Sequence, residues 1–223
     1  MISHKYKLIF VPIPKNASSS VVKYIKGYNY DYGHRSLVSI RDNYKEYYDE
    51  YYKFCIVRNP YDRLVSAYSY FASNPRMTDR TISHVERNRP VDARQYQFMK
   101  QFDSLKTFVL NYLSDIDLPQ APDTSLDFES HHLTSHFFPQ VNWLTNPQAE
   151  LAEDIHVYRY ENMSSIIQDL TQHLFRKHIP LLTSFPQMNK TVREDYKTYY
   201  TDEMYEIVYE KYKKDFEAFN YDR

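Results

Sequence analysis

Three short runs of apolar residues have the length and content of buried strands. The runs are Lys7–Val11, Lys53–Val57 and Ile155–Tyr160. Each is followed by a segment in which apolar residues recur at helical spacing. The segments are Ser18–Lys26, Tyr61–Ala72 and Met163–Phe175. Strands that alternate with helices usually pair in parallel, so this pattern predicts an α/β fold with a central, mainly parallel sheet flanked by helices.

Two further helices are expected outside this alternation. Ser104–Leu113 has helical spacing, and Asp202–Phe219 has the clearest helical pattern in the chain. Thr201 can cap the second helix, and the acidic residues of its first turn suit the helix dipole. Its apolar stripe, which we expect in the core, consists of Met204, Val208, Tyr212 and Phe216.

Two polar stretches interrupt the pattern. Asn74–Gln95 is rich in arginine, and Pro119–Ser135 contains prolines, acidic residues and histidines. Each stretch is either a solvated loop or a loop that faces a substrate, because long loops in compact domains often carry function. No convincing repeat or linker divides the sequence, so a single domain over residues 1–223 is expected.

Composition narrows the classes of function. A net charge of −1 gives no support for broad electrostatic binding to nucleic acid or to a membrane surface. Any anion must therefore bind through locally placed lysine and arginine side chains. The chain has only two glycines, Gly27 and Gly33, whereas a dinucleotide-binding or Walker-type loop needs several in close spacing. The sequence contains neither of these loops.

Cysteine usage and hydropathy bear on the protein's location. The single cysteine, Cys55, excludes an intrachain disulfide, and its apolar neighbours predict a buried thiol. No apolar run reaches the length of a membrane span, and the N-terminal residues lack the apolar stretch of a secretory signal. We therefore expect a cytoplasmic protein, unless the sequence is part of a secretory-pathway protein. The oligomeric state is left open.

The first strand leads into the sequence "PKNASSS", whose composition suits an anion-binding loop. Ligands of open parallel sheets bind beyond the carboxyl ends of the strands, where a helix N-terminus offers unpaired amides. Lys15 adds an ammonium group at this point, and Ser18–Ser20 add hydroxyl groups. The serines are equally compatible with an ordinary helix cap.

The second strand ends in a similar way, within the sequence "FCIVRNPYDRLVSAY". Arg58 follows the strand and can bind a phosphate with its forked guanidinium, and Ser66 lies two helical turns further along. A local ion pair between Arg58 and Asp62 is the alternative. Two strand ends of this kind in one sheet suggest a ligand with two separated phosphate-type groups.

These motifs resemble those of sulfotransferases. "PKNASSS" is similar to the 5′-phosphosulfate loop of that family, and "VRNPYDRLVSAY" is similar to its 3′-phosphate motif, including the spacing of eight between Arg58 and Ser66. "GHRSL", "HFFPQVNWL", "VYRYENM" and the segment that begins with "FPQMNKTVRED" resemble the membrane-free, carbohydrate-type branch. The resemblance covers most of the chain and implies one sulfotransferase domain with a P-loop-like phosphosulfate loop.

The resemblance implies an enzyme that moves a sulfuryl group from 3′-phosphoadenosine 5′-phosphosulfate to a hydroxyl of a carbohydrate acceptor, without a metal. Lys15 would contact the bridging and leaving oxygens of the donor, while Arg58 and Ser66 would hold its 3′-phosphate. Ala17 stands where the family often has glycine, and we expect it to keep a negative φ. The implied donor-binding residues are Lys15, Asn16, Ala17, Ser18, Ser19, Ser20, Arg58 and Ser66.

A histidine would act as the general base, because a pKa of about 6.5 suits proton removal near neutral pH. His34 in "YGHRSL" is the first candidate, since related enzymes carry a catalytic histidine in a similar setting. His136, in a family-like H-x-x-P-Q pattern, is the second, and His131 and His132 are weaker candidates. The nine histidines show no convincing metal-ligand spacing.

Two segments near the expected site have less certain roles. Glu161, which follows Arg159 at the end of the third strand, would bind the acceptor, orient a base or form a structural salt bridge. Asn189–Thr191 would close over the 3′ side of the nucleotide. The alternative functions are a nucleotide or small-molecule kinase, disfavoured by the missing G-K-[ST], and a catalytically inactive nucleotide-binding scaffold.

Overall fold

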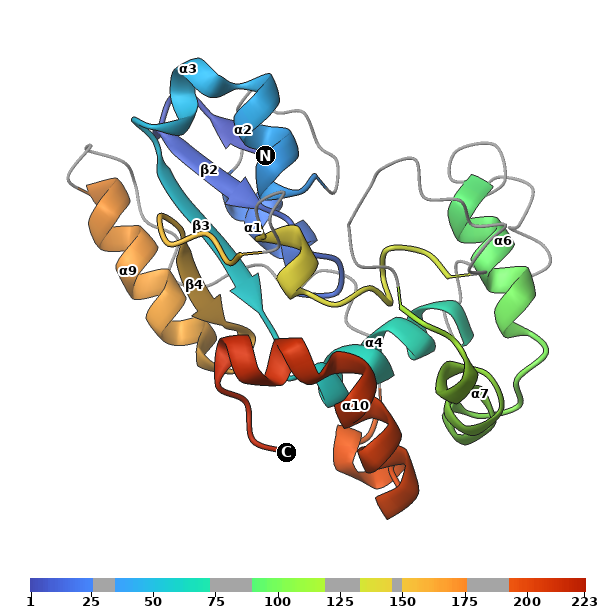
Figure 1. Ribbon diagram of the computed structural model, residues 1–223. Coiled ribbons are helices and arrows are strands. Elements are labelled where there is room, and N and C mark those ends of the chain that lie inside the picture. The colour runs from blue at the N-terminus through green and yellow to red at the C-terminus, as the bar shows by residue number, and fades with distance from the viewer. Residues whose placement is uncertain (26–34, 73–89, 119–132, 146–149, 176–192) are drawn as a thin grey trace. The chain divides into compact units, whose positions relative to one another are not determined.

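The computed structural model describes residues 1–25, 35–72, 90–118, 133–145, 150–175 and 193–223 (Figure 1). The chain divides into two compact units. The sheet unit comprises Met1–Asn59 and Gln140–Lys190, and the helical unit comprises Pro60–Pro139 and Thr191–Arg223. Each unit has a hydrophobic core of its own.

The sheet unit is built on a four-stranded sheet of order β1-β2-β3-β4. β2 (Leu8–Val11), β3 (Tyr52–Val57) and β4 (His156–Arg159) are parallel, and β1 (Ile2–Ser3) pairs with β2 in the antiparallel direction. The predicted α/β fold with a mainly parallel sheet is confirmed. Because β1 has only two residues, it lacks the alternation that would reveal it in the sequence.

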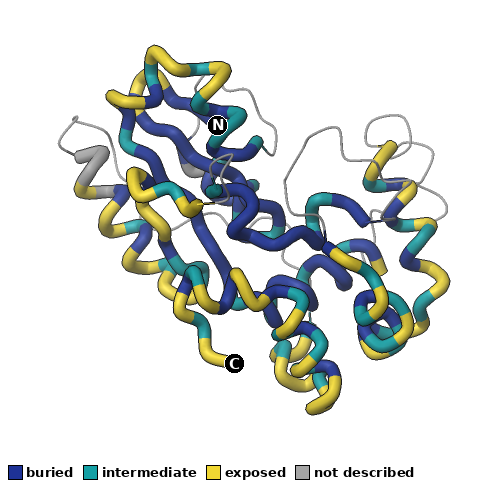
Figure 2. The backbone as a smooth tube through the Cα atoms, viewed as in Figure 1, coloured by how far each residue is buried: buried dark blue, intermediate teal, exposed yellow. Residues whose placement is uncertain are grey.

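Both faces of β2 and β3 are buried, and in Figure 2 these two strands run almost entirely in dark blue. In β4, His156 and Val157 are exposed. Phe10, Phe54 and Tyr158 lie on one face and form a cluster with α1 (Ser18–Tyr24) and α9 (Met163–Phe175). Ile9, Val11, Cys55 and Val57 alternate with that set and have no exposed surface. Nearly all residues of β2 and β3 are apolar because both faces of these strands are covered.

The amino end of β3 carries a buried lysine. Lys53 donates through Nζ to the carbonyl oxygen of Tyr48 at 2.6 Å and pairs with Asp154 at 3.4 Å. These contacts join β3 to α3 (Lys45–Tyr48), which follows α2 (Leu37–Asn43). Neither short helix was predicted. The remaining elements of the sheet unit are η2 (Val141–Trp143) and η3 (Tyr160–Asn162).

The described elements of the helical unit are all helices. They are α4 (Pro60–Ala72), α6 (Pro90–Met99), α7 (Leu105–Asn111), η1 (Leu113–Asp115), η4 (Tyr196–Tyr199) and α10 (Asp202–Phe219). Ser104 and Thr107 form a capping box at α7, and the Thr201 hydroxyl accepts from the Met204 amide at 3.4 Å. The predicted cap and both bounds of α10 are confirmed.

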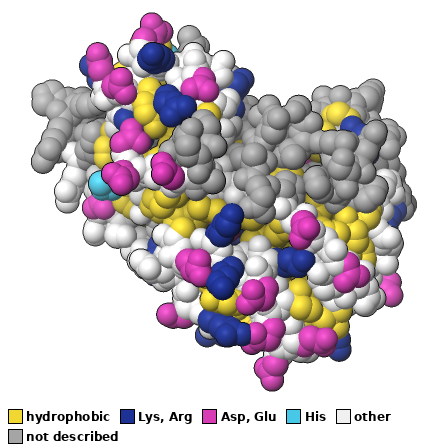
Figure 3. Space-filling model, viewed as in Figure 1, with side chains coloured by type: hydrophobic (Ala, Val, Ile, Leu, Met, Phe, Trp, Pro, Cys, Tyr) yellow, Lys and Arg dark blue, Asp and Glu magenta, His cyan; other side chains and the backbone are white. Residues whose placement is uncertain are grey.

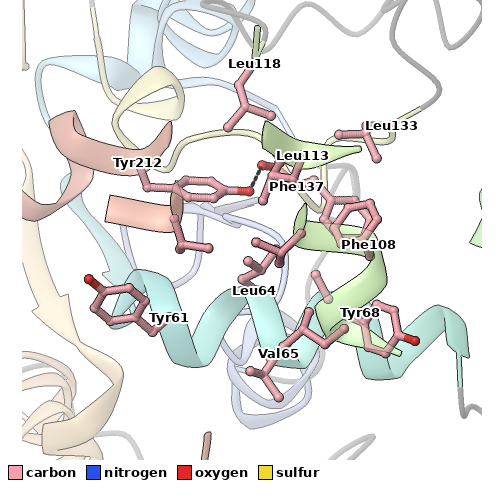
Figure 4. Packing of buried hydrophobic residues seen from close by; sticks show 14 of the residues in the cluster. Tyr61, Leu64, Val65, Tyr68, Phe108, Leu113, Leu118, Leu133, Phe137 and Tyr212 are labelled. Carbon is pink, nitrogen blue, oxygen red and sulfur yellow. Dashed lines mark hydrogen bonds between the residues drawn. The ribbon is translucent and has the colours of Figure 1, made fainter. Parts of the chain in front are cut away.

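Aromatic side chains dominate the core of the helical unit (Figure 4). The predicted stripe of α10 is buried in it, and the backbone of Tyr212 departs from helical geometry within that helix. The Tyr212 hydroxyl donates to the carbonyl oxygen of Phe137 at 2.6 Å, the dashed line of Figure 4. Burial raises the pKa of Tyr212, because the phenolate would lose its hydration.

Part of each polar stretch is ordered against the helical unit. Residues 90–95 of the arginine-rich stretch belong to α6, with Pro90 in the first turn, where its missing N–H costs nothing. The loop interpretation is therefore wrong for residues 90–95. Leu133 and Thr134, near the end of the second stretch, lie in no helix or strand but are buried, so they are not a solvated loop. Residues 73–89 and 119–132 lie outside the described residues.

The surface and the helices add two observations. On the face shown in Figure 3, lysine and arginine side chains are interspersed with acidic ones. In the part of the chain that the structure describes, no helix combines the length and the apolar content that a membrane crossing requires.

Candidate functional site

The carboxyl ends of β2 and β3 lie at one edge of the sheet, because the two strands are parallel and adjacent. Lys15 follows β2 after a short loop, and Arg58 follows β3 directly. The Arg58 guanidinium donates through Nη1 to the carbonyl oxygen of Lys15 at 3.2 Å. The structure thus brings together the two basic residues that the sequence placed at the strand ends.

The loop between β2 and α1 has a left-handed backbone at two positions without glycine. Lys15 has φ 70°, and Ala17 has φ 61° and ψ 19°. The expected negative φ of Ala17 is wrong. Left-handed geometry costs a non-glycine residue about 1–3 kcal/mol and persists only where surrounding contacts impose it. The chain therefore makes this tight turn with strained non-glycine residues, where glycine would adopt the same backbone without strain.

The start of α1 does not use its serines as caps. Ala17 is the N-cap residue and provides no side-chain hydrogen bond. Ser18 lies inside the helix, where its hydroxyl donates back to the carbonyl oxygen of Ile13 at 2.8 Å. The ordinary-cap interpretation is therefore wrong. The backbone amides of a helix start without a side-chain cap can donate hydrogen bonds to an anion.

A glutamine from a distant segment joins the two strand ends. Gln140 accepts through Oε1 from the Arg58 amide at 2.9 Å and from Asn16 Nδ2 at 2.6 Å. Its Nε2 donates to the carbonyl oxygen of Arg58 at 2.8 Å. Asn16 Nδ2 also donates to the carbonyl oxygen of Ile56, at 2.8 Å. Gln140 belongs to the motif "HFFPQVNWL", from which no role for it was predicted.

Asn16 carries a cost of its own in this arrangement. Asn16 has no exposed surface, and its Oδ1 is buried without a hydrogen-bond partner. A buried acceptor left unpaired costs about 1–3 kcal/mol. Such groups in native structures tend to mark functional strain.

The Arg58 side chain is held from two directions. Besides its bond to the Lys15 carbonyl, its guanidinium carbon lies 4.1 Å from the centroid of the Tyr160 ring. A cation over an aromatic face is stabilised by the ring quadrupole and is kept in plane by stacking. Tyr160 was not predicted as a site residue, although it stands in the quoted "VYRYENM". Arg58 is therefore oriented before any ligand arrives.

Glu161 makes a contact that the sequence did not predict. Its Oε1 accepts from the backbone amide of Asn59 at 2.8 Å. This bond fixes the chain immediately after Arg58. The carboxylate therefore supports the end of β3 in this structure.

Ser66 and Asp62 belong to the helical unit. Ser66 lies on α4 and is half-buried. Asp62, considered as a local partner for Arg58, forms an ion pair with Arg193 at 2.5 Å.

His136 has a defined environment. Its Nδ1 lies 3.0 Å from the Thr134 hydroxyl, and its ring stacks on Tyr70 with centroids 5.4 Å apart. The Thr134 amide in turn donates to Gln95 at 2.6 Å. These contacts fix the plane of the imidazole and engage one of its two nitrogens.

Several predicted residues lie outside the described residues. They are His34, His131, His132 and Asn189–Thr191. Among the residues that the structure does describe, no group of three or more potential ligands could hold a metal ion.

Comparisons with known proteins give one match. A family model described as the sulfotransferase family matches residues 1–222, which include segments of both units. The match confirms the resemblance that the sequence motifs indicated. No curated protein and no solved structure matches the chain.

Proposed function

Because this chain belongs to the sulfotransferase family, we propose that it moves a sulfuryl group from 3′-phosphoadenosine 5′-phosphosulfate to a hydroxyl of a carbohydrate acceptor. The observation that carries the choice of donor is the pair of basic residues at adjacent strand ends. Lys15 and Arg58 are joined through the Lys15 carbonyl. A donor with two separated anionic groups is the ligand that such a pair suits.

Lys15, the uncapped start of α1 and Ser18–Ser20 would hold the 5′-phosphosulfate, with Asn16 and Ala17 shaping the loop. Arg58, oriented by Tyr160, would bind the 3′-phosphate through charge-assisted hydrogen bonds, which are about twice as strong as neutral ones. Ser66 would complete that contact. In this proposal the donor is held by these side chains and backbone amides, and no metal has a role.

The reaction is an in-line transfer between two oxygens. The bond from sulfur to the phosphate oxygen of the donor breaks as a bond from sulfur to the acceptor oxygen forms. The acceptor hydroxyl gives its proton to a histidine, and adenosine 3′,5′-bisphosphate leaves. The Lys15 ammonium stabilises the negative charge that grows on the leaving phosphate oxygen, a contribution that rises toward the transition state.

The base is His34 or His136, in that order. His34 follows the helix that begins at the Lys15 loop, and its motif resembles that of carbohydrate sulfotransferases. His136 is supported by the Thr134 hydroxyl, which lies 3.0 Å from Nδ1 and holds the ring in place. The carbohydrate class of the acceptor rests on the same two motifs.

Ligand-induced stabilisation tests the donor. Adenosine 3′,5′-bisphosphate at 100 times its dissociation constant should raise the free energy of unfolding by about 2.7 kcal/mol, and ATP with magnesium by much less. Thermal unfolding with each ligand measures this. Arg58→Ala should remove about 1.5–3 kcal/mol of the binding free energy, because a charge-assisted contact is lost.

Lys23→Ala is the control, since Lys23 is exposed on the same helix α1 and carries no proposed role. This variant should respond to the bisphosphate as the wild type does. Equal stabilisation by ATP with magnesium, and none by the bisphosphate, would favour a kinase instead.

A further inference from the structure

The side-chain amide of Gln140 bonds to both backbone groups of one residue, Arg58. Its Oε1 accepts from the Arg58 amide, and its Nε2 donates to the Arg58 carbonyl, at 2.9 and 2.8 Å. The same Oε1 accepts from Asn16 at 2.6 Å. Gln140 and Asn16 have no exposed surface, so water does not replace these bonds.

These bonds close a ring through both strand ends. Asn16 holds the carbonyl of Ile56 near the end of β3 and binds Gln140, and Gln140 binds the backbone of Arg58. The Arg58 side chain returns to the carbonyl of Lys15, the neighbour of Asn16. The two cations therefore stand on backbone segments that cannot shift independently of each other.

We propose that Gln140 is a positioning residue, which fixes the spacing of the Lys15 loop and Arg58 so that one nucleotide engages both with its two anionic groups. This inference rests on the proposed function. Once one group of such a ligand is bound, the other group meets its site at a high effective concentration. That advantage depends on a fixed spacing of the two sites. A ligand with a single phosphate does not benefit from it.

Few residues could replace glutamine here. Methionine has a similar shape but neither donor nor acceptor. Glutamate keeps the acceptor for Arg58 and Asn16 but, when ionised, lacks the donor for the Arg58 carbonyl. Asparagine is one methylene shorter. Gln140→Met therefore removes all the hydrogen bonds between Gln140 and Arg58, and Gln140→Glu removes only the one to the Arg58 carbonyl. Both substitutions change the side-chain volume little.

Lys53 provides a matched control on the same strand. It is as deeply buried as Arg58 and makes polar contacts to Tyr48 and Asp154, at the opposite end of β3. Lys53→Met should lower the midpoint of thermal unfolding, because it removes buried hydrogen bonds. It should leave the spacing of the strand ends unchanged.

The test compares two ligands by titration calorimetry on the full chain. The ligands are adenosine 3′,5′-bisphosphate and adenosine 5′-monophosphate, and the quantity is the ratio of their dissociation constants. We expect Gln140→Met to reduce the wild-type preference for the bisphosphate at least tenfold and Gln140→Glu to reduce it less. Lys53→Met should keep the wild-type ratio despite its lower melting temperature.

The outcomes separate this inference from the proposed function. An unchanged ratio in Gln140→Met, or in Gln140→Glu if the first variant does not fold, would overturn the positioning role while leaving the donor assignment intact. An equal loss of ratio in Lys53→Met would reduce Gln140 to a structural residue. A wild-type protein that does not prefer the bisphosphate would overturn the donor assignment itself, and the inference with it.

Discussion

The strand ends of the sheet unit and the core of the helical unit are held together by different means. At the strand ends, side-chain amides bond to main-chain groups around a loop with two left-handed residues. In the helical core, aromatic rings pack around α4, α7 and α10, with the bond from Tyr212 to Phe137 as a buried polar contact. The left-handed Lys15 and Ala17 and the unpaired Oδ1 of Asn16 therefore lie where a ligand is proposed to bind.

The strand ends and the helical core differ in what their contacts do when no ligand is bound. A packed aromatic core gains stability from its close contacts, whether or not a ligand is bound. At the proposed binding edge, the side-chain amides of Asn16 and Gln140 instead bond to the backbone of Ile56 and Arg58 and so hold the end of β3. The buried Oδ1 of Asn16 and the backbone of Ala17 show the cost of that arrangement.

The largest effect is expected from replacing the general base. It also tests whether the catalytic residues come from one unit or from both. His34 lies in the sequence range of the sheet unit and His136 in that of the helical unit. Single-turnover rates at saturating donor should fall about 10²–10⁴-fold in His34→Ala, the usual contribution of an acid–base group. His136→Ala should act more on acceptor affinity.

Both histidine variants should keep the stabilisation by adenosine 3′,5′-bisphosphate. A near-normal rate in His34→Ala together with an inactive His136→Ala would transfer the role of base to His136. The active chemistry would then draw on both units.

A smaller effect is expected in the helical core. Tyr212→Phe leaves the buried carbonyl of Phe137 without its donor and should lower the free energy of unfolding by about 1–3 kcal/mol. Urea unfolding at pH 7 measures it. The affinity for the donor should not change. An unchanged affinity would mean that the helical core does not affect binding at the strand ends.

The same variant has a pH dependence of known sign. Because burial raises the pKa of Tyr212 above 10, the folded protein keeps this proton after the unfolded chain has lost it. The contribution is complete below pH 10 and declines as the pH rises toward the folded pKa, by about 1.4 kcal/mol per pH unit. The stability difference between wild type and Tyr212→Phe should therefore shrink above pH 10, and a constant difference would contradict the burial of this hydroxyl.

The smallest effect tests the strain of the Lys15 loop. Ala17→Gly should raise the free energy of unfolding by about 1 kcal/mol, because glycine adopts the left-handed conformation without a Cβ clash. Ala67→Gly within α4 should lower it by at least about 1 kcal/mol, since glycine is unfavourable inside a helix. Chemical unfolding of both variants gives the comparison, and two changes of the same sign would mean that Ala17 is unstrained.

The sequence predicted those features that depend on local pattern. The three parallel strands, α9 and α10 follow from periodicity, and the Thr201 cap follows from residue type. Lys15 and Arg58 were found because both follow apolar strands, and a parallel sheet brings such ends to one edge.

Features that depend on distant partners were not predicted. Gln140 acts on Arg58, which lies 82 residues earlier in the chain, so no local pattern reveals it. The left-handed Ala17 was missed because intrinsic preference favours negative φ, and only the surrounding contacts override it. α6 was missed because its polar residues weaken the helical periodicity.

The tie between Gln140 and Arg58 has a consequence during translation. A ribosome makes Arg58 82 residues before Gln140, a delay of about 4–16 s at roughly 5–20 residues per second. β4, the parallel neighbour of β3, emerges later still. Until then the apolar strand Tyr52–Val57 is an open edge on the nascent chain, and such edges pair with other chains. The order of synthesis therefore leaves this strand open to such pairing until β4 emerges.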